Sequence, residues 1–160
     1  DRYCAGDPNP DFYYGLNVKL SYKNWDFGFN GHGSIGYKVF NDFASNHSTA
    51  YFDVNAGNLP NFATAVKRTG FTQISGDYQY FSDFYLENAS FFRLDDINLG
   101  YTFKDINEKG ANIRVAASCQ NVFVLTNYTG IDPEINSTDG VDRTFWPRPR
   151  TFSVRLNVNF

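Results

Sequence analysis

The feature that most constrains this chain is a strict alternation of side chains over unusually long segments. Even positions are apolar or aromatic in 14–22, odd positions are apolar, aromatic or glycine in 25–39, and 151–160 alternates without exception. Successive side chains of a β-strand point to opposite faces, so a period of two predicts strands with one apolar and one polar face. The first two strands would have about 11 to 16 residues, against about five or six in an ordinary strand.

Two further segments predict strands with a local irregularity. In 90–103 the apolar phase changes from even to odd at Asp95–Asp96, which predicts a β-bulge. In 112–126 the apolar positions are odd at first and ambiguous in the second half. The one plausible helix is Leu59–Arg68, which has a proline in its first turn and a glycine beyond its end. We therefore expect strands near 12–24, 25–40, 90–103, 112–126 and 150–160, and long loops near 41–89 and 127–149.

Composition excludes several protein classes. The 160 residues suit one domain, and a 19% aromatic content excludes disorder. The mean hydropathy of -0.44 and the short longest apolar run, Val122–Leu125, exclude a transmembrane helix but not membrane strands, whose alternation averages to a polar score. The net charge of -3 argues against a nucleic-acid partner. Cys4 and Cys119 are too few for a disulfide framework, and we do not expect them to pair.

Three observations indicate that the apolar faces meet lipid. A strand of 11 residues spans about 36 Å, and a tilt of about 40° fits it to the apolar band of about 25 Å of an outer-membrane barrel. Aromatic residues gather at the predicted strand ends, as at membrane interfaces. The connections alternate short and long, which is typical of periplasmic turns and extracellular loops. Because five strands cannot close a barrel, we expect an all-β, antiparallel fragment of a larger transmembrane β-barrel.

Four segments carry a family resemblance. Residues 6–15 (GDPNPDFYYG) are similar to the G-x-P-x-P-x-F-x-Y-G segment of SusC/RagA-type TonB-dependent outer-membrane transporters. Residues 82–101, which contain YLENASFFRL and LGY, resemble the "YLEDASFLRLxNIxLGY" stretch of that family. Residues 117–134 resemble the penultimate strand and its loop, and residues 146–152 (WPRPRTF) resemble the "YPRPRTF" entry to the final strand. The departures, at Cys119 and Trp146, are small.

The resemblance implies the following expectations. The chain would be the C-terminal part, residues 1–160, of a 22-stranded barrel in the bacterial outer membrane, crossing it several times. The whole protein would import glycans or peptides with energy from TonB, would carry an upstream plug domain, and would partner a SusD-like surface lipoprotein. It would not be an enzyme.

The last ten residues resemble the signal by which the outer-membrane assembly machinery recognises barrel proteins. The five apolar positions of the expected signal are Phe152, Val154, Leu156, Val158 and Phe160. An ordinary last strand that happens to end in Phe is the alternative.

No enzyme or metal motif stands out, so we expect no catalytic, cofactor-binding or metal-binding residues and no cofactor. His32 and His47 lack metal-ligand spacing with the cysteines, and His32 lies on the polar phase of its strand, which predicts a hydrated position in the lumen. The acidic loop from Asp132 to Asp142 lacks the glycine and glutamate of an EF-hand, which favours a solvated loop over calcium. No substrate-binding residue can be assigned.

A β-sandwich binding module, soluble or on the cell surface, is the alternative function. Loop aromatics would then stack on the sugar rings of a carbohydrate, at Tyr51, Phe52, Tyr78, Tyr80 and Phe81.

Overall fold

The computed structural model describes residues 3–47, 82–106, 110–135, 139–143 and 146–159. The chain forms two compact units. The sheet unit comprises residues 11–35, 91–126 and 148–160, and the loop unit comprises residues 1–10, 36–90 and 127–147. The long connections between strands thus build a small core of their own.

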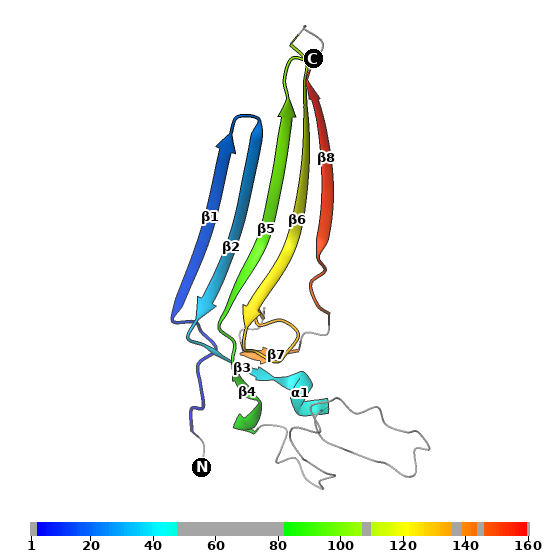
Figure 1. Ribbon diagram of the computed structural model, residues 1–160. Coiled ribbons are helices and arrows are strands. Elements are labelled where there is room, and N and C mark those ends of the chain that lie inside the picture. The colour runs from blue at the N-terminus through cyan, green and yellow to red at the C-terminus, as the bar shows by residue number, and fades with distance from the viewer. Residues whose placement is uncertain (1–2, 48–81, 107–109, 136–138, 144–145, 160) are drawn as a thin grey trace, which may run out of the picture. The chain divides into compact units, whose positions relative to one another are not determined.

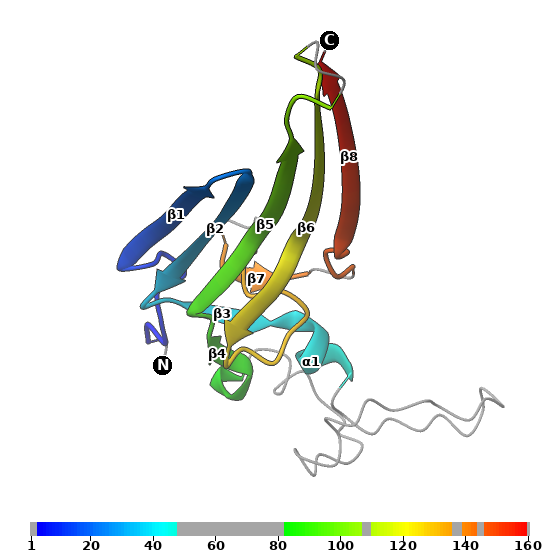
Figure 2. The same ribbon diagram turned by 45° about the horizontal axis from the view of Figure 1, so that its top comes forward.

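The sheet unit is one antiparallel sheet of five strands (Figures 1 and 2). The strands lie side by side in the order β1-β2-β5-β6-β8, and β1 and β8 form its two edges. The bounds are Phe12–Tyr22 for β1, Trp25–Ile35 for β2, Phe91–Phe103 for β5, Asn112–Thr126 for β6 and Thr151–Asn159 for β8. Each connection at one end of the sheet is short, as Figure 1 shows for β1 to β2 and for β5 to β6.

The second strand is shorter than the sequence predicts. The expected strand near 25–40 ends at Ile35, because Gly36 takes a backbone angle φ of 87° that interrupts an extended chain. The alternation beyond it belongs to another strand, β3 (Lys38–Asn41), in a different sheet. Tyr37 and Val39, which continue the expected lipid-facing series, are instead buried in the loop unit.

The predicted β-bulge is present at Asp95. Between β2 and β5, Asn30 pairs with Asp96 while the next residue, Gly31, pairs with Leu94, so Asp95 is the extra residue. The pairing of β5 with β6 also shifts there, from Asp96↔Gln120 to Leu94↔Phe123. This double shift settles the ambiguous half of β6, since the odd-numbered apolar residues pair with the apolar residues of β5.

The loop unit contains a three-stranded sheet in the order β4-β3-β7, with β4 at Leu86–Asn88 and β7 at Val141–Asp142. A short helix α1 (Asp42–His47) follows β3, and a 3-10 helix η2 (Asp83–Tyr85) precedes β4. None of the helices in the described ranges has the length and apolar character needed to cross a membrane. The expected helix Leu59–Arg68 and the loop aromatics of 51–81 lie outside the described residues.

Candidate functional site: the two faces of the sheet

One face of the sheet is apolar in every row that crosses it. Residues directly paired across antiparallel strands lie on the same face, so the pairing register shows which residues form a continuous row across the sheet. Three rows run through all five strands. They are Val18-Phe29-Ile97-Cys119-Phe152, Leu20-Phe27-Leu99-Ala117-Val154 and Tyr22-Trp25-Tyr101-Val115-Leu156. We call this surface the outer face.

Beyond the bulge the outer face continues through two glycines that make room for aromatic rings. Phe92 lies against Gly31, and the Tyr14 ring lies against Gly33, where an added Cβ would overlap it. The two rings stack with centroids 6.2 Å apart, and the Tyr14 hydroxyl donates to the carbonyl of Phe91 at 3.3 Å. The Tyr14 hydroxyl group therefore has a hydrogen-bond acceptor within the protein.

The extent of the outer face matches a bilayer. From Phe92 to Phe103 along β5 it covers about 36 Å at about 3.3 Å per residue, and a strand tilt of about 40° reduces this to a height of about 28 Å. Many of these side chains are left exposed by the described chain, on central as well as edge strands: Leu20 is 59%, Leu99 46% and Val154 81% exposed. A contiguous apolar surface of this size requires a membrane or a partner to cover it.

The opposite, inner face is polar and carries paired charges. Arg114 on β6 reaches Asp26 on β2 across the intervening strand β5, with Nε–Oδ1 and Nη2–Oδ2 distances of 3.0 and 2.5 Å. Gly100 lies beneath this ion pair, and an added Cβ there would come within 2.5 Å of Arg114 Nη2. The glycine thus permits an ion pair that spans three strands.

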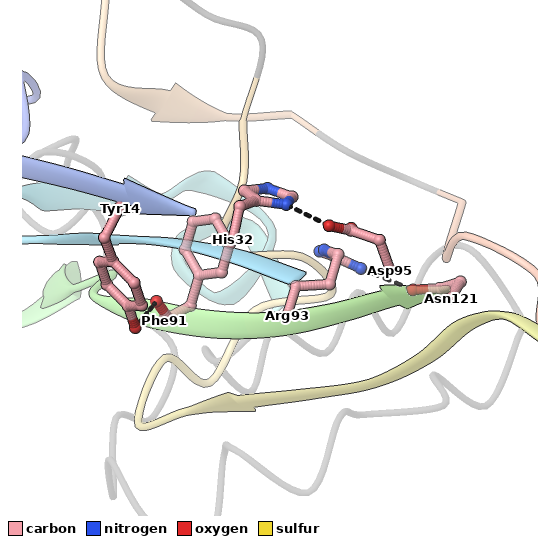
Figure 3. Close-up of polar contacts among 6 residues, drawn as sticks. All are labelled: Tyr14, His32, Phe91, Arg93, Asp95 and Asn121. Carbon is pink, nitrogen blue, oxygen red and sulfur yellow. Dashed lines mark hydrogen bonds and ion pairs between the residues drawn. The ribbon is translucent and has the colours of Figure 1, made fainter. Parts of the chain in front are cut away.

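A second polar cluster occupies the inner face at the bulge (Figure 3). The bulge turns Asp95 toward β2, where its Oδ2 lies 2.6 Å from Nδ1 of His32. The His32 ring meets the Phe91 ring edge to face, with centroids 5.5 Å apart. His32 is on the polar face, as predicted, but it is a half-buried partner of Asp95 and not simply a hydrated side chain.

Arg93 and Asn121 extend this cluster to β6. Arg93 is buried, its guanidinium lies over the Phe91 ring at 5.8 Å, and its Nη1 donates to Oδ1 of Asn121 at 2.7 Å (Figure 3). Asn121 Nδ2 donates to the carbonyl of Arg148 at 2.7 Å, in the segment that leads to β8. Asn121 has a φ of 51°, a left-handed conformation that asparagine tolerates better than most residues.

Sequence reasoning did not single out Arg93, Asp95 and Asn121 as a group. A signal was available, because the phase change at Asp95–Asp96 marks the bulge that brings them together. Their partners come from strands far apart in sequence, so the pairing itself could not be read from the pattern. The cluster ties three strands together at the bulge through side-chain hydrogen bonds.

The interior of the loop unit contains hydrogen-bonded polar groups beside its apolar side chains. The Tyr128 hydroxyl donates to Oδ2 of the buried Asp142 at 2.7 Å; burial, and then this hydrogen bond, raise the pKa of Tyr128 far above its ordinary value. Glu87 accepts hydrogen bonds from the backbone N–H and the hydroxyl of Thr129, at 2.7 and 2.6 Å. Tyr37 donates to the carbonyl of Pro133 at 2.9 Å. These bonds fix the long connections against one another.

The expectation of a solvated acidic loop at 132–142 is wrong for its two ends. Asp132 and Asp142 are buried, because backbone and tyrosine donors satisfy their carboxylates. Asp139 does lie at the surface, where its pairing with Arg143 at 2.8 Å lowers its pKa. Within the residues that the structure describes, no group of three or more His, Cys, Asp or Glu side chains could hold a metal ion.

Four of the five residues of the expected assembly signal lie on β8, at the edge of the sheet. Phe152, Val154, Leu156 and Val158 each pair with an apolar residue or cysteine of β6 on the outer face, and Phe160 lies outside the described residues.

The chain is similar in sequence to TonB-dependent receptors. It is 37% identical over 168 aligned residues to the TonB-dependent receptor SusC of Bacteroides thetaiotaomicron, and 31% identical over 180 to the TonB-dependent receptor P3 of Formosa agariphila. Each alignment covers all of this chain but only 16% and 17% of the relative, so the chain spans about a sixth of their length. No family model matches the chain.

Solved structures show the same fold. A structure of the RagAB peptide transporter superposes with a TM-score of 0.68 at 22% identity, covering 93% of this chain and 17% of the other. The RagAB peptide importer in the 'open-open' state gives 0.65 at 20% identity, with 95% and 17% covered. The five-stranded sheet and its connections thus have the fold of part of a transporter chain.

Proposed function

The chain is a segment of a SusC/RagA-type TonB-dependent receptor, and from this premise we propose that it forms part of the transmembrane wall of an outer-membrane importer. The imported nutrient would be a glycan or a peptide, the cargo classes that the resemblance implies. A wall segment of this kind contributes no catalytic residue, and the relatives are named as receptors and an importer.

The observation that carries the proposal is the pair of opposed faces of one sheet. The outer face is apolar in all of its rows and exposed, while the inner face holds hydrogen-bonded charges. In a membrane barrel the first face meets lipid and the second lines a polar lumen. Backbone groups at the free edges of β1 and β8 need partners in a bilayer, which further strands of the whole protein would supply.

The alternative, a β-sandwich binding module, is not favoured. A sandwich packs the apolar face of one sheet against a second sheet, whereas the outer face here is exposed, most of all on β8.

The test uses the full-length protein in its outer membrane. A closed barrel should migrate anomalously in electrophoresis until it is boiled, and cells that lack the protein should lose growth on one glycan or peptide that the complemented strain uses. A protein that fractionates with soluble proteins and shows no heat-dependent shift would refute the proposal.

We further propose that the loop unit lies outside the cell and contributes to contact with a SusD-like lipoprotein, while TonB would act through parts of the protein beyond this chain. The short turns would then be periplasmic. Removal of 48–80, which leaves α1 and its buried Ser45 in place, should keep the barrel assembled but weaken co-purification of the lipoprotein. Unchanged co-purification would contradict this assignment.

For the assembly signal, we propose that β8 and Phe160 are read by the assembly machinery and that the surrounding lipid then covers their apolar side chains. Deletion of Phe160 should lower the amount of assembled barrel and leave import per assembled molecule nearly normal. Phe160→Trp, which keeps an aromatic end, serves as the control and should assemble normally. Normal assembly of the deletion variant would remove Phe160 from the signal.

A further inference from the structure

The outer face contains a groove near the short-turn end of the sheet. It is a shallow, open depression with a volume of about 590 Å³. The side chains that line it are Trp25, Leu99, Tyr101, Phe103, Val115 and Ala117. It lies where small residues on β6 leave a depression beside the large residues of β5.

The aromatic wall of the groove is held in place by contacts between rings. Trp25 meets Tyr101 with centroids 4.7 Å apart at 65°, and Tyr101 meets Phe103 at 4.7 Å and 71°. Such edge-to-face pairs are mutually stabilising. The groove is therefore formed before anything enters it, and its wall need not rearrange to admit a ligand.

A cation lies at the same end of the sheet as the groove. Lys23 occupies the turn between β1 and β2, and its Nζ is 5.2 Å from the centroid of the Tyr22 ring. Tyr22 pairs directly with Trp25, which lines the groove. Lys23 has a φ of 55°, in a region where glycine or asparagine is the usual turn residue. A long cationic side chain thus stands at the interface end of an apolar groove.

We propose that this groove binds one acyl chain of an anionic phospholipid, whose phosphate is met by Lys23. The proposal rests on the proposed function, which places the outer face in the membrane and the short turns in the periplasm. The groove and Lys23 together indicate the chemistry of the ligand. The groove is continuous with a lipid-facing surface, where an unfilled depression would lose dispersion contacts and a flexible chain can restore them. The ammonium group complements a negatively charged headgroup.

The site selects by shape and charge rather than by apolar burial. A lipid tail leaves one apolar environment for another when it enters the groove, so burial alone contributes little. The chain gains packing against fixed aromatic rings, and the headgroup gains the attraction of Lys23. Lipids elsewhere on the outer face lack the combination of this groove and Lys23, so this lipid should exchange more slowly than its neighbours.

The experiment compares lipid retention by the full-length protein. The receptor is reconstituted in vesicles of equal parts phosphatidylcholine and phosphatidylglycerol, extracted in mild detergent, and examined by native mass spectrometry for bound phospholipid. Two variants probe the site, Ala117→Phe to fill the groove and Lys23→Gln to remove the charge. Val18→Phe, on the outer face of β1, and Lys19→Gln, on its polar face, are the matched controls.

Wild type and both controls should retain phosphatidylglycerol in preference to phosphatidylcholine. Lys23→Gln should lower that preference by about fivefold, the effect expected of one lysine near an anionic surface. Ala117→Phe should remove the retained lipid. Retention of both lipids in equal amounts, or retention unchanged in either variant, would overturn the proposal.

Failure of the proposed function would look different. A protein that is not a membrane barrel would not insert into the vesicles and would show no heat-dependent shift in electrophoresis, whereas an inserted, heat-shifted receptor without selective lipid would refute only the lipid site.

Discussion

In the sheet unit, Phe152 and Val154 on β8 are 75% and 81% exposed, whereas in the loop unit Val39 and Tyr85 are 0% and 2% exposed. The loop unit is organised as a protein in water: its apolar groups are inside, and its buried Asp142 has a hydrogen-bond donor in Tyr128. The sheet unit instead exposes the apolar side chains of its outer face and carries ion pairs such as Asp26–Arg114 on its inner face. The two units therefore place their apolar side chains in opposite ways, in the interior of the loop unit and on the surface of the sheet unit.

The largest effect should come from a charge on the outer face. Val18→Arg should cost about 2 to 4 kcal/mol of folding free energy if the residue lies near the bilayer centre. Asn17→Arg, one residue away on the inner face, should be tolerated. Urea titration of the heat-dependent electrophoretic shift measures the folding free energy of both variants. Equal values for the two variants would contradict the assignment of the two faces.

A smaller effect is expected from the glycines that make room for aromatic rings. Gly33→Ala should cost about 1 to 3 kcal/mol, because the new methyl group overlaps the Tyr14 ring and the Phe91 backbone. Gly15→Ala on β1 is the control; its nearest contact would be the Gly31 carbonyl at 4.0 Å, so it should be neutral. The same titration distinguishes them, and matched midpoints would show that the rings shift without strain.

The loop unit should respond independently of the sheet. Tyr128→Phe removes the hydrogen bond to the buried Asp142 carboxylate and should cost that unit about 1 to 3 kcal/mol. Tyr3→Phe, which removes a hydrogen bond to Asp83 at the surface, should change little. Limited proteolysis of loops on intact membranes measures the effect. A loss of the heat-dependent shift in Tyr128→Phe would show that the two units do not behave separately.

The smallest effect concerns the surface pair Asp139 and Arg143. Because the pKa of Asp139 is lowered in the folded state, any stability from this pair is present above the ordinary aspartate pKa and lost as the pH falls through the lowered value. Both groups are at the surface, so water and salt screen the attraction. Asp139→Asn should leave loop proteolysis at pH 7 unchanged; faster cleavage would mean that this surface pair anchors the loop.

Much of the sheet could be predicted from residue order. The alternation in 14–22 and 151–160 sets which side chains share a face, and the phase change at Asp95–Asp96 marks the bulge. The paired partners across the bulge could not be predicted, because a strand's own pattern carries no information about which distant residue lies opposite. The cluster of His32, Arg93 and Asn121 depends on those pairings.

The loop unit could be predicted far less. Alternation continues through Tyr37 and Val39, so the period alone does not separate them from the outer-face series that ends at Ile35. The backbone turn at Gly36 ends the strand, and Tyr37 and Val39 are buried in the loop unit. Likewise, the sequence predicts that Asp132 and Asp142 lie at the surface. The hydrogen-bond donors that permit their burial, the Glu134 N–H and the Tyr128 hydroxyl, are identified only in the folded chain.

The sequence by itself determined the all-β class, the apolar and polar faces and the family of this chain, because strand periodicity and motifs are local properties of residue order. Only the tertiary structure decided where β2 ends, which charges meet on the inner face, and which loop residues form a core of their own. Those outcomes depend on contacts between residues far apart in sequence, where register and desolvation, rather than local preference, set the free energy.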